Sequence, residues 1–212
     1  MNYKAVIFDL DGVICHTDHY HFLAWKQLAH RLGIPFHEKD NDRLRGVSRM
    51  ESLNIILEKS PRVYSAQEKQ SFAEEKNENY KRLLMQMTPA DLPQKTLAAL
   101  QALRARGLLL GIGSSSKNTK LILSRLGISD FFDVVADGTE ISKSKPDPEV
   151  FLLAANKLGV LPAEAIVVED ADAGIQAAKA GGFFAVGIAA AAGHPAADFS
   201  INEISALIGI VE

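Results

Sequence analysis

The sequence has almost no cysteine: Cys15 is the single one among 212 residues, so no disulfide can form within the chain. This composition fits a reducing compartment. We expect Cys15 to act as a small buried apolar residue rather than as a reactive thiol.

An excess of basic residues and a long apolar run are also missing. Lys and Arg number 23 against 26 Asp and Glu, which gives a net charge of −3 and argues against duplex nucleic acid or an anionic membrane as partner. The longest nearly apolar run, residues 183–192, falls well short of the ~20 residues that cross a bilayer. The residues before Asp9 lack the pattern of a signal peptide. We expect a cytoplasmic protein.

Short apolar runs alternate with helical patterns over most of the chain. Residues 4–8 (KAVIF) show no polar alternation, as in a strand buried on both faces of a parallel sheet, and residues 108–112, 166–168 and 183–188 resemble them. Apolar residues three or four apart predict helices over 97–105, 121–126 and 150–158. This order predicts an α/β fold with a doubly wound, Rossmann-like parallel sheet.

Residues from about 17 to 87 break the alternation, because they show helical periodicity without a convincing strand. One apolar stripe includes Trp25 and Leu28, and two further helices begin after Ser48 and Ser65, each with a glutamate three residues later, as in a capping box. We predict a core domain of residues 1–14 and 90–212, with a helical cap domain, residues 15–89, inserted after the first strand.

Polar side chains follow the predicted strands where each one ends. Asp9 and Asp11 follow the first strand, three serines from Ser114 follow the second, and the pair Glu169 and Asp170 follows a later one. Ligands of open parallel sheets bind at the carboxyl ends of the strands. Lys145 stands before a proline in a loop that precedes another helix.

This set of residues suits phosphoryl transfer. Four carboxylates would repel one another without a cation, and oxygen ligands favour Mg²⁺. Serine hydroxyls and Lys145 can donate to a phosphate. The ordinary aspartate pKa of ~3.9 predicts that Asp9 is ionised as a nucleophile near neutrality, and Asp11 could serve as general acid and base.

The order of these motifs resembles the haloacid dehalogenase (HAD) superfamily of phosphotransferases and, within it, the β-phosphoglucomutase family. The segments that carry the resemblance are FDLDGVI, HTDHYHFLAWK, LRGVSRMESL, KNENY, SSSKN, SKPDPEVF and EDADAGIQAAKAGG. The resemblance implies a Mg²⁺-dependent enzyme with one ion per subunit. It would interconvert β-D-glucose 1-phosphate and glucose 6-phosphate through an aspartyl phosphate, with β-glucose 1,6-bisphosphate as activating intermediate.

The resemblance also implies roles for individual residues. Asp9 would be the nucleophile and Asp11 the acid and base, while Ser114 and Lys145 would bind the transferring phosphoryl group. The metal ligands would be Asp9, Asp11, Glu169 and Asp170. The substrate-binding candidates are Thr17, His21, Trp25, Gly46, Val47, Ser48, Arg49, Ser52, Lys76, Ser115, Ser116 and Asn118.

Among these candidates, Arg49 would bind the substrate phosphate that does not react. A cation in the first turn of a helix is mildly unfavourable against the helix dipole, which favours a functional role. On pattern alone Lys76 would be a surface lysine and Trp25 a core residue of the cap, so their inclusion depends on the resemblance.

The sequence departs from the family pattern at three positions. Ala171 stands where a serine is more frequent, Ser115 where a small apolar residue is common, and Gln94 where a glycine follows the proline. Because Ala171 and Ser115 border the expected metal and phosphate sites, they bear on how these sites are tuned.

Two alternatives remain open. A sugar-phosphate phosphatase of the same superfamily would carry the same motifs. A phospho-receiver module, which is not an enzyme, also combines an aspartate, Mg²⁺, a hydroxyl and a lysine, although it lacks a helical cap. In each enzymatic reading the partner is a small sugar phosphate, and we expect a monomer.

Overall fold

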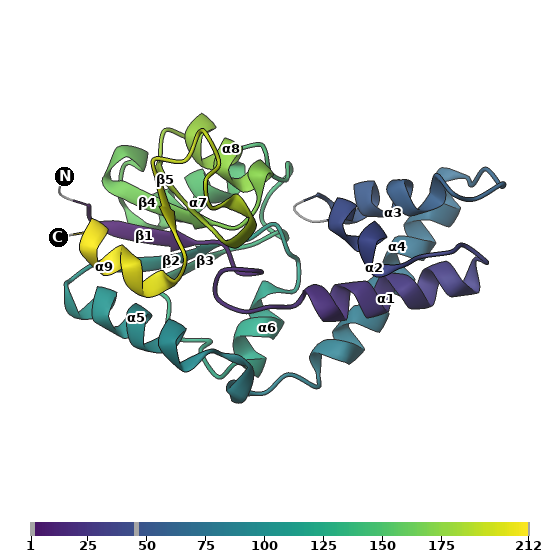
Figure 1. Ribbon diagram of the computed structural model, residues 1–212, viewed down its shortest axis with the longest axis horizontal. Coiled ribbons are helices and arrows are strands. Elements are labelled where there is room, and N and C mark those ends of the chain that lie inside the picture. The colour runs from purple at the N-terminus through teal and green to yellow at the C-terminus, as the bar shows by residue number, and fades with distance from the viewer. Residues whose placement is uncertain (1–2, 45–46, 212) are drawn as a thin grey trace. The chain divides into compact units, whose positions relative to one another are not determined.

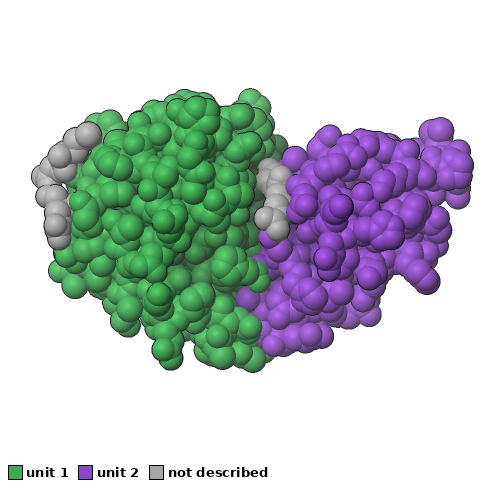
Figure 2. Space-filling model, in the orientation of Figure 1, with its two compact units in different colours: residues 1–16, 88–212 green, residues 17–87 purple. Residues whose placement is uncertain are grey.

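The computed structural model describes residues 3–44 and 47–211 (Figure 1). The chain divides into two compact units, residues 1–16 with 88–212 and residues 17–87, shown in different colours in Figure 2. Each unit has its own hydrophobic core, and each is described by itself.

The larger unit contains a parallel sheet whose strands have the order β3-β2-β1-β4-β5-β6. Every neighbouring pair is parallel, with Phe8 opposite Ile112 on one side and Val168 on the other. The carboxyl ends of the strands therefore meet at one edge. The bounds are β1 Ala5–Phe8, β2 Leu109–Gly113, β3 Val134–Ala136, β4 Ala165–Glu169, β5 Phe184–Ile188 and β6 Phe199–Ile201.

Helices cover both faces of this sheet. Helices α7 (Glu149–Leu158) and α8 (Asp172–Ala180) pack on one face, where their apolar side chains form a core with Ile7 and Val167. On the other side in Figure 1 lie α5 (Gln94–Ala105) and the short α9 (Leu207–Ile210). Helix α6 (Thr119–Arg125) follows β2. The predicted α/β class with a doubly wound parallel sheet is confirmed.

The sheet has two strands that the sequence patterns did not predict. Both β3 and β6 lie at the edges of the sheet and have three residues each. Because an edge strand is only partly covered, β6 includes the exposed polar Ser200 and β3 is half-buried over two of its residues. A run of only three residues is too short for its pattern to distinguish a strand from a loop.

The smaller unit is helical throughout its described residues. It contains α1 (Asp18–Arg31), α2 (Glu38–Asn41), a 3₁₀ turn (Asp42–Leu44), α3 (Arg49–Leu57) and α4 (Ala66–Leu84). The Ser48 hydroxyl accepts from the Glu51 amide at 3.2 Å, and Ser65 and Glu68 form both bonds of a capping box. Trp25 and Leu28 lie in its core, as their spacing predicts.

Two expectations about burial can be compared with the structure. Cys15 is 1% exposed and its thiol lies 3.9 Å from the carbonyl oxygen of Leu10, so it fills the core as a small apolar residue. Burial raises the pKa of its thiol, which keeps it protonated. Among the described residues, no helix is both long and apolar enough to pass through a bilayer.

Candidate active site

Asp9 lies directly beyond β1, at the edge where the carboxyl ends of the strands meet. Its backbone amide donates to the carbonyl oxygen of Val168 in β4 at 2.9 Å, which continues the sheet by one residue. The Lys145 ammonium lies 2.5 Å from a carboxylate oxygen of Asp9 and 2.5 Å from one of Glu169. The three residues are 7%, 8% and 1% exposed, in the order Asp9, Lys145 and Glu169.

The charges of this cluster do not balance. Burial raises the pKa of Asp9 well above its usual value; Lys145 opposes this shift, while Glu169, Asp170 and Asp11 add to it. The same two carboxylates, Asp9 and Glu169, outweigh the burial of Lys145 and raise its pKa, so the lysine is protonated. Without a bound cation, the buried Asp9 therefore does not keep its ordinary pKa, and its ionisation depends on positive charge nearby.

Two glycines allow acidic side chains to approach the backbone closely. A Cβ atom at Gly12 would lie 2.0 Å from a carboxylate oxygen of Asp170, and the φ of Gly12 is +85°. A Cβ atom at Gly174 in α8 would lie 1.9 Å from the carboxyl carbon of Glu169. Any larger residue would displace these carboxylates, so both glycines help to place them.

The donor set at this edge fits a hard divalent cation. The carboxylates of Glu169, Asp170 and Asp11 raise the pKa of Asp9, while Lys145 contacts Asp9 and Glu169. Excess negative charge of this kind is stabilised by Mg²⁺. Within residues 3–44 and 47–211, no three His, Cys, Asp or Glu side chains form a ready-made metal cluster. A site built from two carboxylates, one backbone carbonyl and water needs no such cluster.

The serine loop after β2 is folded around its own hydroxyls. Ser114 is 2% exposed, and its hydroxyl accepts from the Ser116 amide at 3.2 Å. The Ser116 hydroxyl accepts from the amide of Asn118 at 3.2 Å. Because β2 pairs with β1, this loop and Asp9 lie at the ends of neighbouring strands of the same sheet.

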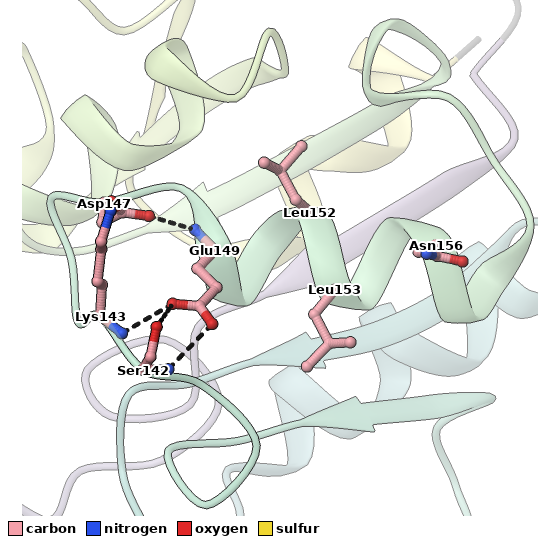
Figure 3. Close-up of a pocket in the computed structure, with 7 residues that line it drawn as sticks. All are labelled: Ser142, Lys143, Asp147, Glu149, Leu152, Leu153 and Asn156. Carbon is pink, nitrogen blue, oxygen red and sulfur yellow. Dashed lines mark hydrogen bonds and ion pairs between the residues drawn. The ribbon is translucent and has the colours of Figure 1, made fainter.

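Lys145 is carried by a loop that Glu149 holds in place. The Glu149 carboxylate accepts from the Ser142 amide at 2.9 Å, the Ser142 hydroxyl at 2.9 Å and the Lys143 amide at 2.7 Å (Figure 3). These bonds lower the pKa of Glu149. A hollow of about 440 Å³ lies on this outer surface, lined by Glu149, Leu152 and their neighbours. None of the predicted catalytic residues lines it.

Several predicted substrate-binding residues of the smaller unit are buried around one lysine. Lys76 is 2% exposed, and its ammonium lies 2.9 Å from Nδ1 of His21 and 4.6 Å from the ring centroids of Trp25 and Tyr80. Burial lowers the pKa of His21, and Lys76 and Arg49 lower it further, so the neutral ring accepts from Lys76 at Nδ1. The expectation from the helical pattern alone, a solvated surface lysine, is therefore wrong for Lys76.

The remaining substrate-binding candidates of the smaller unit are Thr17, which contacts Tyr80, and residues at or near the start of α3. The Tyr80 hydroxyl donates to the buried Thr17 hydroxyl at 3.0 Å. Arg49 is half-buried, and burial lowers its pKa. Val47 and Ser48 are exposed and Ser52 is buried. Gly46 lies outside the described residues.

The sequence patterns missed three residues that support these sites. No motif singles out Tyr80, whose hydroxyl donates to Thr17. Glu149 is the first residue of α7 and holds the loop of Lys145, and Gly138 follows the short strand β3. The Gly138 amide donates to the carbonyl of Ser116 at 3.1 Å and so holds the serine loop. The Asp-Gly pair at residues 137–138, a common turn signal, could have indicated Gly138.

Fold and site together define a phosphotransferase of the HAD type. The family model for haloacid dehalogenase-like hydrolases matches residues 3–182, so the chain belongs to this family. The model describes hydrolases, which are enzymes, and this argues against the receiver-module alternative.

Two relatives and one solved structure are similar to this chain over most of its length. The β-phosphoglucomutase of Bacillus subtilis (strain 168) is 45% identical over 206 residues, covering 96% of this chain and 91% of that protein. A solved structure of β-phosphoglucomutase from Clostridium difficile has a TM-score of 0.88 at 40% identity, covering 97% and 93% of the two chains. A phosphorylated carbohydrates phosphatase of Thermotoga maritima is 31% identical over 181 residues, covering 84% of this chain and 82% of that protein.

Proposed function

We propose that this protein interconverts β-D-glucose 1-phosphate and glucose 6-phosphate by transferring a phosphoryl group to and from Asp9. The observation that carries the proposal is the 45% identity to a β-phosphoglucomutase over nearly the whole chain. It is supported by the buried Asp9, Lys145 and Glu169 cluster at the carboxyl ends of β1 and β4.

In the first half of the reaction the phosphorylated Asp9 gives its phosphoryl group to the C6 hydroxyl of β-glucose 1-phosphate. The bond between phosphorus and the Asp9 oxygen breaks, the bond to O6 forms, and Asp11 takes the proton from O6 as general base. The product is β-glucose 1,6-bisphosphate, and Asp9 is a free carboxylate again.

In the second half the bisphosphate binds in the opposite orientation and returns its C1 phosphoryl group to Asp9. The bond between phosphorus and O1 breaks, and Asp11 gives back the proton to O1 as general acid. Glucose 6-phosphate leaves, and the phosphorylated enzyme is restored. Because one group takes and returns the proton, the cycle balances without an outside acid or base.

We propose that Asp9, the Asp11 backbone carbonyl and Asp170 hold one Mg²⁺ ion, with Glu169 in or beside its coordination sphere. When bound, Mg²⁺ neutralises the negative charge that would keep an anionic substrate from an anionic nucleophile. Lys145 holds the Asp9 carboxylate in position and contributes the second positive charge. Ser114 and the amides that follow it donate to the transferring phosphoryl group.

We propose that residues 15–89 act as a cap that excludes water during transfer. A mutase needs this exclusion, because water would otherwise compete with the sugar hydroxyl for the aspartyl phosphate. Arg49 binds the phosphate that does not react. The wall that faces the sugar is formed by Gly46, Val47, Ser48, Ser52 and Lys76. The neutral His21 and Thr17, bonded to Lys76 and Tyr80, keep this wall in one arrangement.

The second candidate function is a sugar-phosphate phosphatase, which the similarity to the Thermotoga maritima phosphatase favours. One assay separates the two. The protein is incubated with β-glucose 1-phosphate, Mg²⁺ and a catalytic amount of β-glucose 1,6-bisphosphate. Glucose 6-phosphate as the main product supports the mutase, whereas glucose and inorganic phosphate in its place would overturn it.

A further inference from the structure

Ser115 is the middle one of three consecutive serines beyond β2, and its hydroxyl differs from the other two. The hydroxyls of Ser114 and Ser116 each accept from a backbone amide in the same loop. The Ser115 hydroxyl oxygen is buried and has no hydrogen-bond partner in the part of the chain that the structure describes. The loop therefore uses two hydroxyls to hold itself and leaves the third without a bond.

The backbone around Ser115 is held from both sides. The Ser114 amide donates to the carbonyl of Ala136 at 3.1 Å, and the carbonyl of Ser116 accepts from the amide of Gly138 at 3.1 Å and from the Thr119 hydroxyl at 2.9 Å. The Gly138 backbone packs so closely that a Cβ atom there would lie 2.2 Å from the carbonyl oxygen of Ser115. These contacts hold the loop in place, so the Ser115 hydroxyl cannot easily turn toward solvent.

A buried hydroxyl without a partner is costly. Leaving such a group unsatisfied destabilises the folded chain, and orphaned polar atoms in native proteins call for an explanation such as a function or a bound group. Ser115 stands at the carboxyl edge of β2, next to β1 and its Asp9. The group that the proposed reaction brings to this edge is a phosphoryl group, whose oxygens are strong acceptors.

We propose that the Ser115 hydroxyl donates a hydrogen bond to an oxygen of the bound phosphoryl group, in addition to the bonds from the Ser114 hydroxyl and the loop amides. This inference rests on the phosphoryl transfer proposed above. It makes Ser115 a side chain that binds substrate through its own hydroxyl, where a small apolar residue would contribute only its backbone.

The test measures the affinity of the Mg²⁺-loaded protein for orthovanadate, a phosphoryl analogue, in the Ser115→Ala variant and in the native sequence. We expect a loss of about 10- to 100-fold, the range for a hydrogen bond to a charged group. The Tm of the ligand-free variant should stay the same or rise, because alanine removes a buried polar atom that has no partner. Ser124→Ala, on the exposed face of α6, is the matched control and should bind vanadate normally.

An unchanged vanadate affinity in Ser115→Ala would overturn the inference, and a lowered Tm with unchanged affinity would assign the hydroxyl to a buried water instead. The Ser115→Thr variant, which keeps the hydroxyl, should recover part of the affinity, and no recovery at a native Tm would count against it. Product analysis of the native protein is independent of these results. If the native protein released glucose and phosphate, the mutase proposal would fail. The role of Ser115 in phosphoryl binding would still stand or fall on the vanadate affinities.

Discussion

Lys145 is the positively charged residue that contacts the buried carboxylates of Asp9 and Glu169. Its ammonium contacts two buried carboxylates at 2.5 Å each, and it also lies 4.5 Å from the ring centroid of Phe151. The motif before a proline predicted this lysine as a phosphate binder. Its second role, as the ammonium that bridges Asp9 and Glu169 in a buried site and opposes the rise in the pKa of Asp9, came from the contacts of the folded chain.

Replacing Asp9 by Asn should abolish the phosphorylated enzyme, since an amide oxygen does not attack phosphorus at a useful rate. The fold should persist, because the amide oxygen can still accept from Lys145. Intact-protein mass measured after incubation with the bisphosphate checks this. Asp130→Asn, at an exposed position, is the control and should still gain a phosphoryl group. Phosphorylation of Asp9→Asn at the native level would move the nucleophile elsewhere.

Replacing Lys145 by Met should destabilise the metal-free protein by about 3–5 kcal/mol, because two buried carboxylates lose their shared partner. Urea unfolding measures this loss. Added Mg²⁺ should restore part of the stability if these carboxylates lie at a cation site. Lys157→Met breaks a partly exposed pair with Glu140 and should cost no more than ~1 kcal/mol. Equal losses in the two variants would contradict this account of the cluster.

Elements differ in how far their sequences predict them. Strands β1, β2, β4 and β5 are buried apolar runs, and each was predicted within one or two residues. Helices α3 and α4 begin at the serines whose spacing to a glutamate predicted them. Strands β3 and β6 exist because neighbouring strands supply hydrogen bonds, which a pattern of three residues cannot reveal.

The loop before α7 gives a prediction at this scale. Glu149→Gln should weaken the bonds to Ser142 and Lys143, and the loss of Lys145 positioning should lower kcat/KM about 10- to 100-fold. At neutral pH the Tm should fall only slightly, since these bonds lie at the surface. The control is Glu164→Gln. It weakens a similar bond, in which the Leu161 amide donates to the Glu164 carboxylate before β4, and it should leave kcat/KM unchanged. Native kcat/KM in Glu149→Gln would rule out a positioning role.

The bonds that Glu149 accepts from Ser142 and Lys143 should make the stability of the protein depend on acid pH in a definite direction. The amides of Ser142 and Lys143 lower the pKa of Glu149 below its ordinary value of 4.5 in the folded protein. Its stabilising contribution is therefore complete above that ordinary value and is lost as the pH falls through the folded pKa. Glu149→Gln removes the titrating group, so the stability of the native protein should fall more steeply below pH ~4.5 than that of the variant.

At the scale of the whole molecule, the proposed reaction needs both compact units, because a mutase must hold two phosphates. Arg49→Ala should lower isomerisation of β-glucose 1-phosphate at least ~10-fold, the order expected when a charge-assisted contact to the second phosphate is lost. Transfer from Asp9 to water should fall less, since water needs no distal anchor. Parallel assays of glucose 6-phosphate and inorganic phosphate measure the ratio. Arg43→Ala, an exposed arginine paired with Glu58, is the control. Equal losses of both activities would remove Arg49 from this role.

The sequence by itself determined the α/β class, the helical nature of residues 17–87 and the order of the motifs around Asp9, because strand burial, helix periodicity and capping are local properties of the chain. Only the tertiary structure decided that Lys145 bridges Asp9 and Glu169, that Lys76 is buried between aromatic rings beside His21, and that the Ser115 hydroxyl has no partner among the described residues. These features join residues distant in sequence or depend on burial. Their energies therefore arise only when the chain has folded.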